Sequence, residues 1–84
     1  MIYKIKYTKK SIKDAKLVKQ SPYNKKVKCL LNLLSEDPDS LNPEVLSGNY
    51  SGCLSLRINL QHRLVYIKNE ELKTITIISL WGHY

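Results

Sequence analysis

The chain has 84 residues and a formal net charge of +7, so it is a small basic protein. Its length predicts one domain, residues 1–84, with a modest core. No apolar run approaches the roughly 18 residues of a membrane-spanning helix, and the first ten residues lack the apolar stretch of a signal peptide. We therefore expect a cytoplasmic protein with no membrane partner.

The charge is unevenly placed along the chain. Residues 1–28 contain ten lysines and one acid, whereas residues 29–84 contain four basic residues and six acids. A basic amino-terminal part indicates a polyanionic partner, either nucleic acid or an acidic protein. The alternative is that these lysines only keep helix surfaces soluble.

A strand and a helix are the first expected elements. Apolar residues alternate with lysines over residues 1–7, which indicates a half-buried strand. A helix over residues 9–19 would begin at Thr8 or Ser11, whose hydroxyls can cap its first turn. Its inward side chains would be Ile12, Ala15 and Val18.

A second helix is expected to begin at Ser21-Pro22, where a capping hydroxyl precedes a proline. It would end near Ser35, because Asp37 precedes Pro38 and is biased away from helical geometry. Its apolar stripe consists of Tyr23, Val27, Leu30, Leu31 and Leu34. Two helices joined by so few residues predict a helical hairpin.

The rest of the chain predicts a loop over residues 37–49 and then three strands. They cover residues 53–60, 63–68 and 72–80, and the last would lie inside the sheet because it is β-rich on both faces. The first of them would turn Leu54, Leu56, Ile58 and Leu60 to one side. The sequence thus predicts an α+β fold of order β-α-α-β-β-β, with an antiparallel sheet packed against the helical hairpin.

Several residues of the carboxyl-terminal half suit proton and phosphate chemistry. Glu44 falls in the expected loop, as a solvated acid or as a general base facing a low-dielectric cleft. Arg57 and Arg63 are the only arginines beside twelve lysines. A guanidinium grips a phosphate at two points, although pairing with a carboxylate of the sheet is equally compatible. Whether the two arginines share one face depends on the turn at residues 60–62.

The last two residues, His83 and Tyr84, follow an apolar strand whose end Trp81 can anchor. An imidazole can donate a proton near neutral pH. His62, by contrast, is interpreted as a turn residue.

Together these residues indicate RNA cleavage without a metal or other cofactor. Glu44 would take the proton of a ribose 2′-hydroxyl, and Arg63, helped by Arg57, would stabilise charge on the phosphate. His83 would protonate the leaving 5′-oxygen, and Tyr84 would stack on a base or hold the phosphate. The products would be a 2′,3′-cyclic phosphate and a 5′-hydroxyl.

These residues lie in motifs that resemble the RelE superfamily of bacterial toxin–antitoxin ribonucleases, most closely its YoeB (Txe) branch. The motifs are Pro43-Glu44-Val45-Leu46, Tyr50-Ser51-Gly52, Ser55-Leu56-Arg57-Ile58-Asn59, His62-Arg63-Leu64-Val65-Tyr66 and His83-Tyr84. The first arginine of the family's Arg-Arg pair is Leu56 here. This difference would remove a charge that could touch rRNA or substrate, and the amino-terminal lysines could compensate for it.

The resemblance implies an enzyme that cuts mRNA in the ribosomal A site and is neutralised by a cognate antitoxin. It also implies binding to operator DNA only through the antitoxin, and a homodimer is a further expectation. By matched position it implies Glu44 as general base, Arg63 as phosphate stabiliser and His83 as general acid, with Arg57 and Tyr84 in support. The alternative is a non-catalytic basic module that binds RNA or protein with the same fold.

Overall fold

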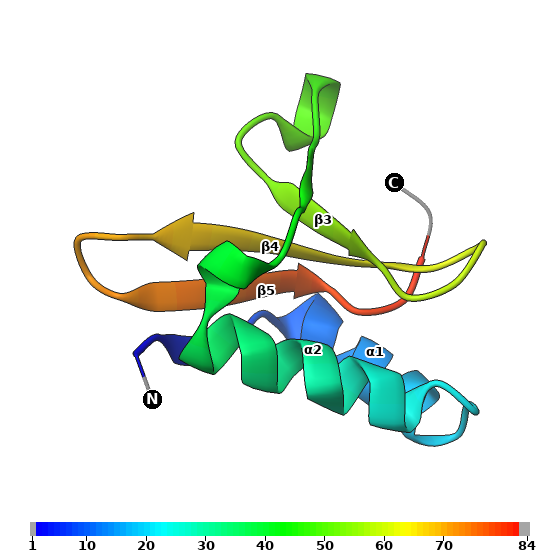
Figure 1. The fold of residues 1–84 in the computed structure, drawn as a ribbon. Coiled ribbons are helices and arrows are strands. Elements are labelled where there is room, and N and C mark those ends of the chain that lie inside the picture. Colours follow the sequence, from blue (N-terminus) through cyan, green and yellow to red (C-terminus); the bar gives the residue numbers. More distant parts are fainter. Residues whose placement is uncertain (1, 83–84) are drawn as a thin grey trace.

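The computed structural model describes residues 2–82 and confirms the α+β fold class. Two helices cover one face of a five-stranded sheet (Figure 1). The elements are β1 (Lys4–Tyr7), α1 (Lys9–Lys19), α2 (Asn24–Glu36), β2 (Glu44–Val45), β3 (Leu54–Arg57), β4 (Arg63–Asn69) and β5 (Thr74–Ser79), with short 3-10 helices at Pro38–Ser40 and Gly48–Tyr50. Neither α-helix within residues 2–82 has the length and apolar character needed to cross a membrane.

The strand order across the sheet is β1-β5-β4-β3-β2. The last three strands form the predicted antiparallel meander, and β5 lies inside the sheet as expected. The sheet is nevertheless mixed, because β1 runs parallel to β5, with Ile5 opposite Ile75. The chain leaves β1 through both helices, enters the sheet again at the far edge and returns to β1 through the meander.

The limits of α1 agree with the prediction, and so do the inward positions of Ala15 and Val18, but that of Ile12 does not. Thr8 is the capping residue: its Oγ1 accepts the amide N–H of Ser11 at 3.2 Å and donates to the carbonyl of Ile77 at 2.9 Å. Ile12 is 53% exposed, so its expected burial is wrong. The buried residues of α1 are Ser11, Asp14 and Val18. Two of these three are polar, so they need hydrogen-bond partners inside the protein.

Helix α2 begins at Asn24 rather than at Ser21-Pro22. The Ser21 hydroxyl donates to the carbonyl of Val18 at 2.8 Å and accepts the N–H of Tyr23 at 3.2 Å. It therefore closes the turn between the two helices instead of capping the second one. The expected apolar stripe does face the sheet, with Val27 and Leu34 fully buried.

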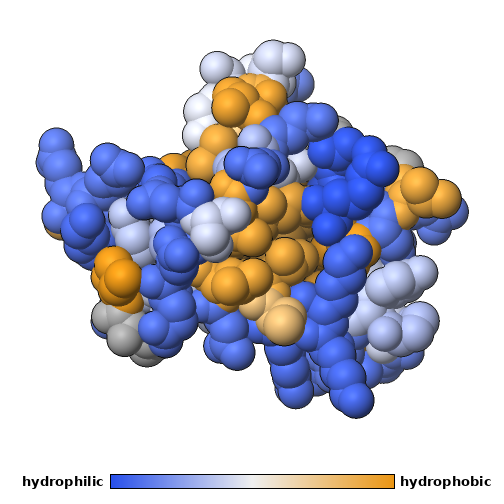
Figure 2. Space-filling view, viewed as in Figure 1, coloured by the Kyte–Doolittle hydropathy of each residue, from blue (hydrophilic) through white to orange (hydrophobic). Residues whose placement is uncertain are grey.

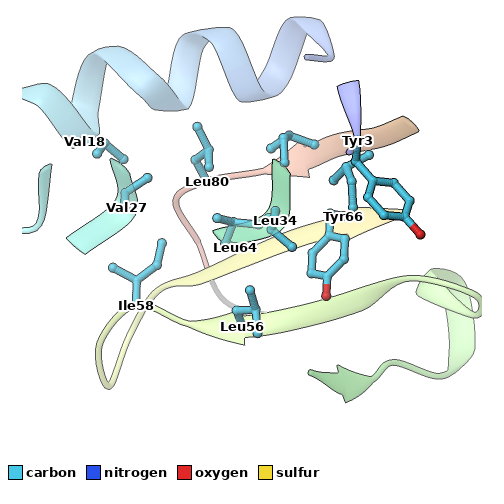
Figure 3. Packing of buried hydrophobic residues seen from close by; sticks show 11 residues of the cluster. Tyr3, Val18, Val27, Leu34, Leu56, Ile58, Leu64, Tyr66 and Leu80 are labelled. Atoms are coloured by element: carbon cyan, nitrogen blue, oxygen red, sulfur yellow. The ribbon is translucent and has the colours of Figure 1, made fainter. Parts of the chain in front are cut away.

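The core lies between the helices and the face of the sheet that they cover. Figure 3 shows Val18 and Val27 of the helices directed toward Leu80 and the strands, with Leu34 between α2 and the sheet. The strands contribute Leu56, Leu64, Tyr66, Ile75 and Ile77, the turn after β3 contributes Ile58, and Tyr3 precedes β1. Burial of these apolar side chains supplies the main driving force for folding.

The second expected strand is shorter than residues 53–60, and the loop expected before it contains a strand. β3 ends at Arg57, and Leu60 is 89% exposed in the following turn, contrary to the prediction. Asn59 Oδ1 accepts the N–H groups of Gln61 and His62, both at 2.7 Å, and this side chain fixes the turn. Within the expected loop at residues 37–49, Glu44 and Val45 form β2 at the edge of the sheet.

Candidate active site

Glu44 is placed by a strand, not by a loop. The two residues of β2 pair with β3 in antiparallel register, Glu44 opposite Ser55 and Val45 opposite Leu54. A strand of two residues is too short to show an alternation of apolar and polar residues in the sequence. Only its pairing with β3 identifies it as a strand. The backbone of Glu44 is thereby fixed relative to β3.

Glu44, Arg57 and Arg63 share the face of the sheet that points away from the helices. Arg57 lies directly opposite Arg63, and Leu56, its neighbour in β3, lies opposite Leu64 in the core. Because side chains alternate along a strand, both arginines face the other side. The structure thus shows that Arg57 and Arg63 share one face, which the sequence of the turn at residues 60–62 had left open.

Arg63 connects the acid to the sheet. Its Nη1 donates to Glu44 Oε2 at 2.5 Å and to the buried hydroxyl of Ser55 at 3.0 Å. A guanidinium carries five N–H donors, so Nη2 and Nε remain for a second acceptor. The alternation of β3 puts Ser55 on this face, but sequence gave no sign that its hydroxyl would hold an arginine.

The surroundings of the pair are open. The Glu44 side chain is 64% exposed and that of Arg63 is 21% exposed. Of the two alternatives for the surroundings of Glu44, the solvated acid describes the chain alone and the low-dielectric cleft does not: the carboxylate lies at a solvated edge and its partner is half-buried beneath it. The pair is accessible to a substrate.

Arg57 is exposed and has no ion-pair partner within residues 2–82. It lines an open cavity at the end of β3 instead. Leu56 is 7% exposed and belongs to the core, so a charge at this position would point away from the face that carries Arg57. The structure gives Leu56 a packing role.

The segment that leads to the carboxyl terminus is held beside Arg63. The backbone N–H of Arg63 donates to the carbonyl of Gly82 at 3.1 Å. The His62 ring stacks on Trp81 with a centroid distance of 3.6 Å and an interplanar angle of 12°. Trp81 is thus the predicted anchor, whereas His62 does more than form a turn. Its buried Nδ1 has no hydrogen-bond partner within the described chain.

A second contact holds the same segment from the side of α1. Asp14 Oδ2 accepts hydrogen bonds from Lys10 Nζ at 2.7 Å, from Ser79 Oγ at 3.1 Å and from the N–H of Leu80 at 3.1 Å. Lys10 Nζ also donates to the carbonyl of Trp81 at 3.3 Å. We call this group the Asp14 cluster. Sequence reasoning missed it, because a single acid in a lysine-rich helix carries no signal of its partners.

His83 and Tyr84, the predicted acid and its supporting group, lie outside the described residues. What the structure describes is the backbone that leads to them, held by Arg63 and the Asp14 cluster at residues 79–82. No group of three or more His, Cys, Asp or Glu side chains that could hold a metal ion occurs among residues 2–82.

The remaining basic residue of β4 is engaged elsewhere. Lys68 Nζ lies 2.9 Å from Asp39 Oδ1 and 3.3 Å from Glu70 Oε1. The hydrogen bond to Asp39 raises the pKa of Lys68 above its ordinary value, because it stabilises the ammonium form. Within β3 and β4, the arginines are therefore the cations of the open face that remain near Glu44.

Comparison with known proteins identifies relatives of this chain. A model of the YoeB-like toxins of bacterial type II toxin–antitoxin systems matches residues 7–84. The toxin YoeB of Synechocystis sp. is 40% identical over 62 residues, which cover 71% of this chain and 70% of that protein.

Solved structures agree in both fold and extent. The YoeB dimer of Staphylococcus aureus has a TM-score of 0.82 and 30% identity, with all of both chains covered. The heterotetrameric YoeB–YefM toxin–antitoxin complex of the same organism gives a TM-score of 0.78 and 31% identity, with 98% of both chains covered.

Proposed function

Since the chain belongs to the YoeB-like toxin family of bacterial type II toxin–antitoxin systems, we propose that it is a ribosome-dependent endoribonuclease that cleaves mRNA in the A site. The observation that carries this proposal is the Glu44–Arg63 pair on the open face of the sheet. It brings a proton acceptor and a phosphate ligand into direct contact. These are the two groups that attack by a ribose 2′-hydroxyl requires.

Glu44 acts as the general base of the first step. Its Oε2 is held by Arg63, while Oε1 makes no hydrogen bond to the described part of the chain. This oxygen accepts the proton of the 2′-hydroxyl, and the 2′-oxygen forms a bond to the adjacent phosphorus. Because Glu44 is 64% exposed, the ribosome and the mRNA must supply the covering that excludes water from the site.

Arg63 stabilises the negative charge that develops on the phosphate. Its Nη1 already donates to Glu44 and Ser55, which fixes the plane of the guanidinium. Nη2 and Nε can then donate to two phosphoryl oxygens without releasing Glu44. Arg57, opposite Arg63 in the neighbouring strand, adds positive charge on the same side.

His83 completes the reaction as general acid. The bond between phosphorus and the 5′-oxygen breaks, and the imidazolium gives its proton to that oxygen. A 2′,3′-cyclic phosphate and a 5′-hydroxyl result, and Tyr84 supports the phosphate or a base. The assignment of these two residues rests on the family motif, and the anchoring of Trp81 and Gly82 next to Arg63 supports it.

The proposal includes partners. A cognate antitoxin would neutralise the enzyme in the cytoplasm, as the YoeB–YefM complex of Staphylococcus aureus suggests, and operator DNA would be reached only through that antitoxin. The YoeB dimer of that organism supports a homodimer for this chain as well. The lysines of residues 1–28 would contact rRNA.

Cleavage of mRNA on programmed ribosomes tests the proposal. The wild type, Glu44→Gln and His83→Gln are compared, with Glu71→Gln as a control that removes an acid from an exposed turn. We expect A-site cleavage with cyclic or 3′-phosphate ends for the wild type and the control, and none for the other two. A wild type that binds ribosomes but cuts nothing would instead identify a non-catalytic binding module. Cleavage by His83→Gln would refute the general-acid role.

A further inference from the structure

A cavity of about 490 Å³ opens at the end of β3, beside the Glu44–Arg63 pair but separate from it. Its walls come from the start of α2, which supplies Lys26, and from the turn between β3 and β4. In Figure 1 this turn and the amino-terminal end of α2 lie on the same side of the molecule. Figure 2 shows both hydrophilic and apolar side chains on this side of the molecule.

An aromatic ring forms part of this wall. Tyr23, at the start of α2, lies 6.4 Å from Trp81 with an interplanar angle of 48°. Trp81 is itself stacked on His62, so the tyrosine ring is supported by two further rings. Tyrosine rings on a protein surface stack on the unpaired bases of single-stranded RNA.

Amide side chains line the opposite wall. Asn59 Oδ1 is occupied by the turn, which leaves its NH₂ group as a donor. Gln61 is exposed and offers both a donor and an acceptor. Base edges carry donors and acceptors in adjacent positions, and amides can pair with them. The cavity thus combines a stacking surface with groups that can pair with a base edge.

Two cations connect this cavity to the site already described. Lys26 and Arg57 line it, and both are exposed. Arg57 lies directly opposite Arg63, and directly opposed residues in an antiparallel pair have Cα atoms roughly 5 Å apart. A nucleotide in the cavity would therefore be adjacent to one whose phosphate is bound by Arg63.

We propose that this cavity binds the base of the nucleotide next to the scissile phosphate, with Tyr23 as the stacking ring and Gln61 as the group that reads the base edge. The inference rests on the proposed function, because the scissile phosphate is defined by Arg63. The volume falls within the range of about 300–1,000 Å³ that is typical of small-ligand pockets. Lys26 and Arg57 hold the flanking phosphate.

The test uses RNA that the protein cannot cut. A fluorescent 2′-O-methyl hexanucleotide lacks the attacking hydroxyl, and six further hexamers each carry one abasic residue. Binding of the full chain is measured by fluorescence anisotropy at one fixed ionic strength, because phosphate contacts depend on salt. We expect the affinity of the wild type to fall by at least about fivefold when the missing base is at one particular position.

Substitutions then locate the effect. Tyr23→Leu should bind the intact hexamer and the most affected abasic hexamer equally, whereas Tyr23→Phe keeps the ring and should retain the difference. Lys26→Ala should weaken all hexamers about threefold or more, compared with Lys25→Ala, which removes the neighbouring exposed lysine outside the cavity. Circular dichroism confirms that each variant is folded.

Two results would overturn the inference. One is that the wild type binds every abasic hexamer as tightly as the intact hexamer, or that it binds no hexamer at all. The other is displacement of the intact hexamer by a poly-glutamate peptide with no dependence on Tyr23, which would identify a surface for an acidic protein. Base-dependent binding without ribosomal cleavage would refute the proposed reaction but keep this base site. Ribosomal cleavage without base-dependent binding would refute this base site but keep the proposed reaction.

Discussion

Two carboxylates, Glu44 and Asp14, each pair with a basic side chain, and the two pairs differ in what surrounds them. Glu44 is 64% exposed at the sheet edge and meets Arg63 of β4 across the intervening strand β3. The Asp14 side chain is 9% exposed and accepts hydrogen bonds from a lysine, a serine hydroxyl and a backbone amide. The Glu44 carboxylate is open to solvent, whereas Oδ2 of Asp14 accepts three hydrogen bonds inside the protein.

The difference separates a reactive pair from a structural one. An exposed ion pair contributes little to stability, so its partners can leave each other for a substrate at small cost. Removal of a buried carboxylate leaves its hydrogen-bond donors inside the protein without an acceptor, which is costly. We therefore expect substitutions at Glu44 and Arg63 to change cleavage, and substitutions at Asp14 to change stability.

The largest expected effect is at Arg63. Arg63→Lys keeps the positive charge but loses the planar fork that reaches both Glu44 and a phosphate. We expect cleavage on programmed ribosomes to fall by about 100-fold or more, with little change in urea unfolding. Lys68→Arg is the control, because it exchanges a lysine and an arginine at a residue of the same strand that pairs with Asp39. This variant should cleave normally. Normal cleavage by Arg63→Lys would show that charge alone is sufficient.

The next effect in size is at Asp14. Asp14→Ala leaves Ser79 and the N–H of Leu80 without their acceptor, so we expect the free energy of unfolding to fall by about 2–4 kcal/mol. Urea unfolding followed by circular dichroism measures it. Glu44→Gln, in which the exposed pair is broken, should lie within about 1 kcal/mol of the wild type. Equal losses of unfolding free energy in Asp14→Ala and Glu44→Gln would show that the two acids do not differ in their contribution to stability.

A smaller effect is expected for the stack of His62 on Trp81, which joins the reactive side to the anchored segment. A double-mutant cycle with His62→Ala and Trp81→Ala should give a coupling energy of about 0.5–1.5 kcal/mol in urea unfolding. A coupling near zero would mean that the rings are only neighbours. The Asp14 cluster would then be the principal anchor of residues 79–82.

The smallest effect concerns Tyr66 in the core, away from both acids. Burial raises the pKa of the Tyr66 hydroxyl above its ordinary value of 10.0, because the charged phenolate is poorly solvated there. The unfolded chain therefore loses this proton first, and stability decreases as the pH rises above about 10. Tyr66→Phe should show a shallower decrease in unfolding free energy between pH 9 and 11. Identical slopes would assign the decrease to other groups, such as Lys68.

Local patterns predicted the helices and the meander well, because apolar spacing and a capping hydroxyl act within a few residues. The limits of α1 and the capping role of Thr8 agree with the structure. The same reasoning failed at Ile12 and Asp14, since the partners of Asp14 are 65 and 66 residues away. An acid is buried only where the rest of the fold brings donors to it.

The candidate site shows the same limit. The residue types of Glu44, Arg57 and Arg63 were sufficient to nominate them, whereas their common face depended on the register of β3 against β4. A shift of one residue in that register would have separated the arginines. Ser55 and His62 became part of the site only through tertiary pairing, so sequence reasoning passed over both.

The interior position of β5 has a consequence for the timing of folding in the cell. This strand is synthesised after both β1 and β4, the strands that it separates. While a ribosome is still making it, the growing chain holds its amino-terminal strand apart from the meander, and neither can close the sheet. The helices lack the part of their packing face that Ile75 and Ile77 of β5 supply. The five-stranded sheet is therefore complete only after translation has passed β5, so the folded protein cannot exist before nearly the whole chain has been made.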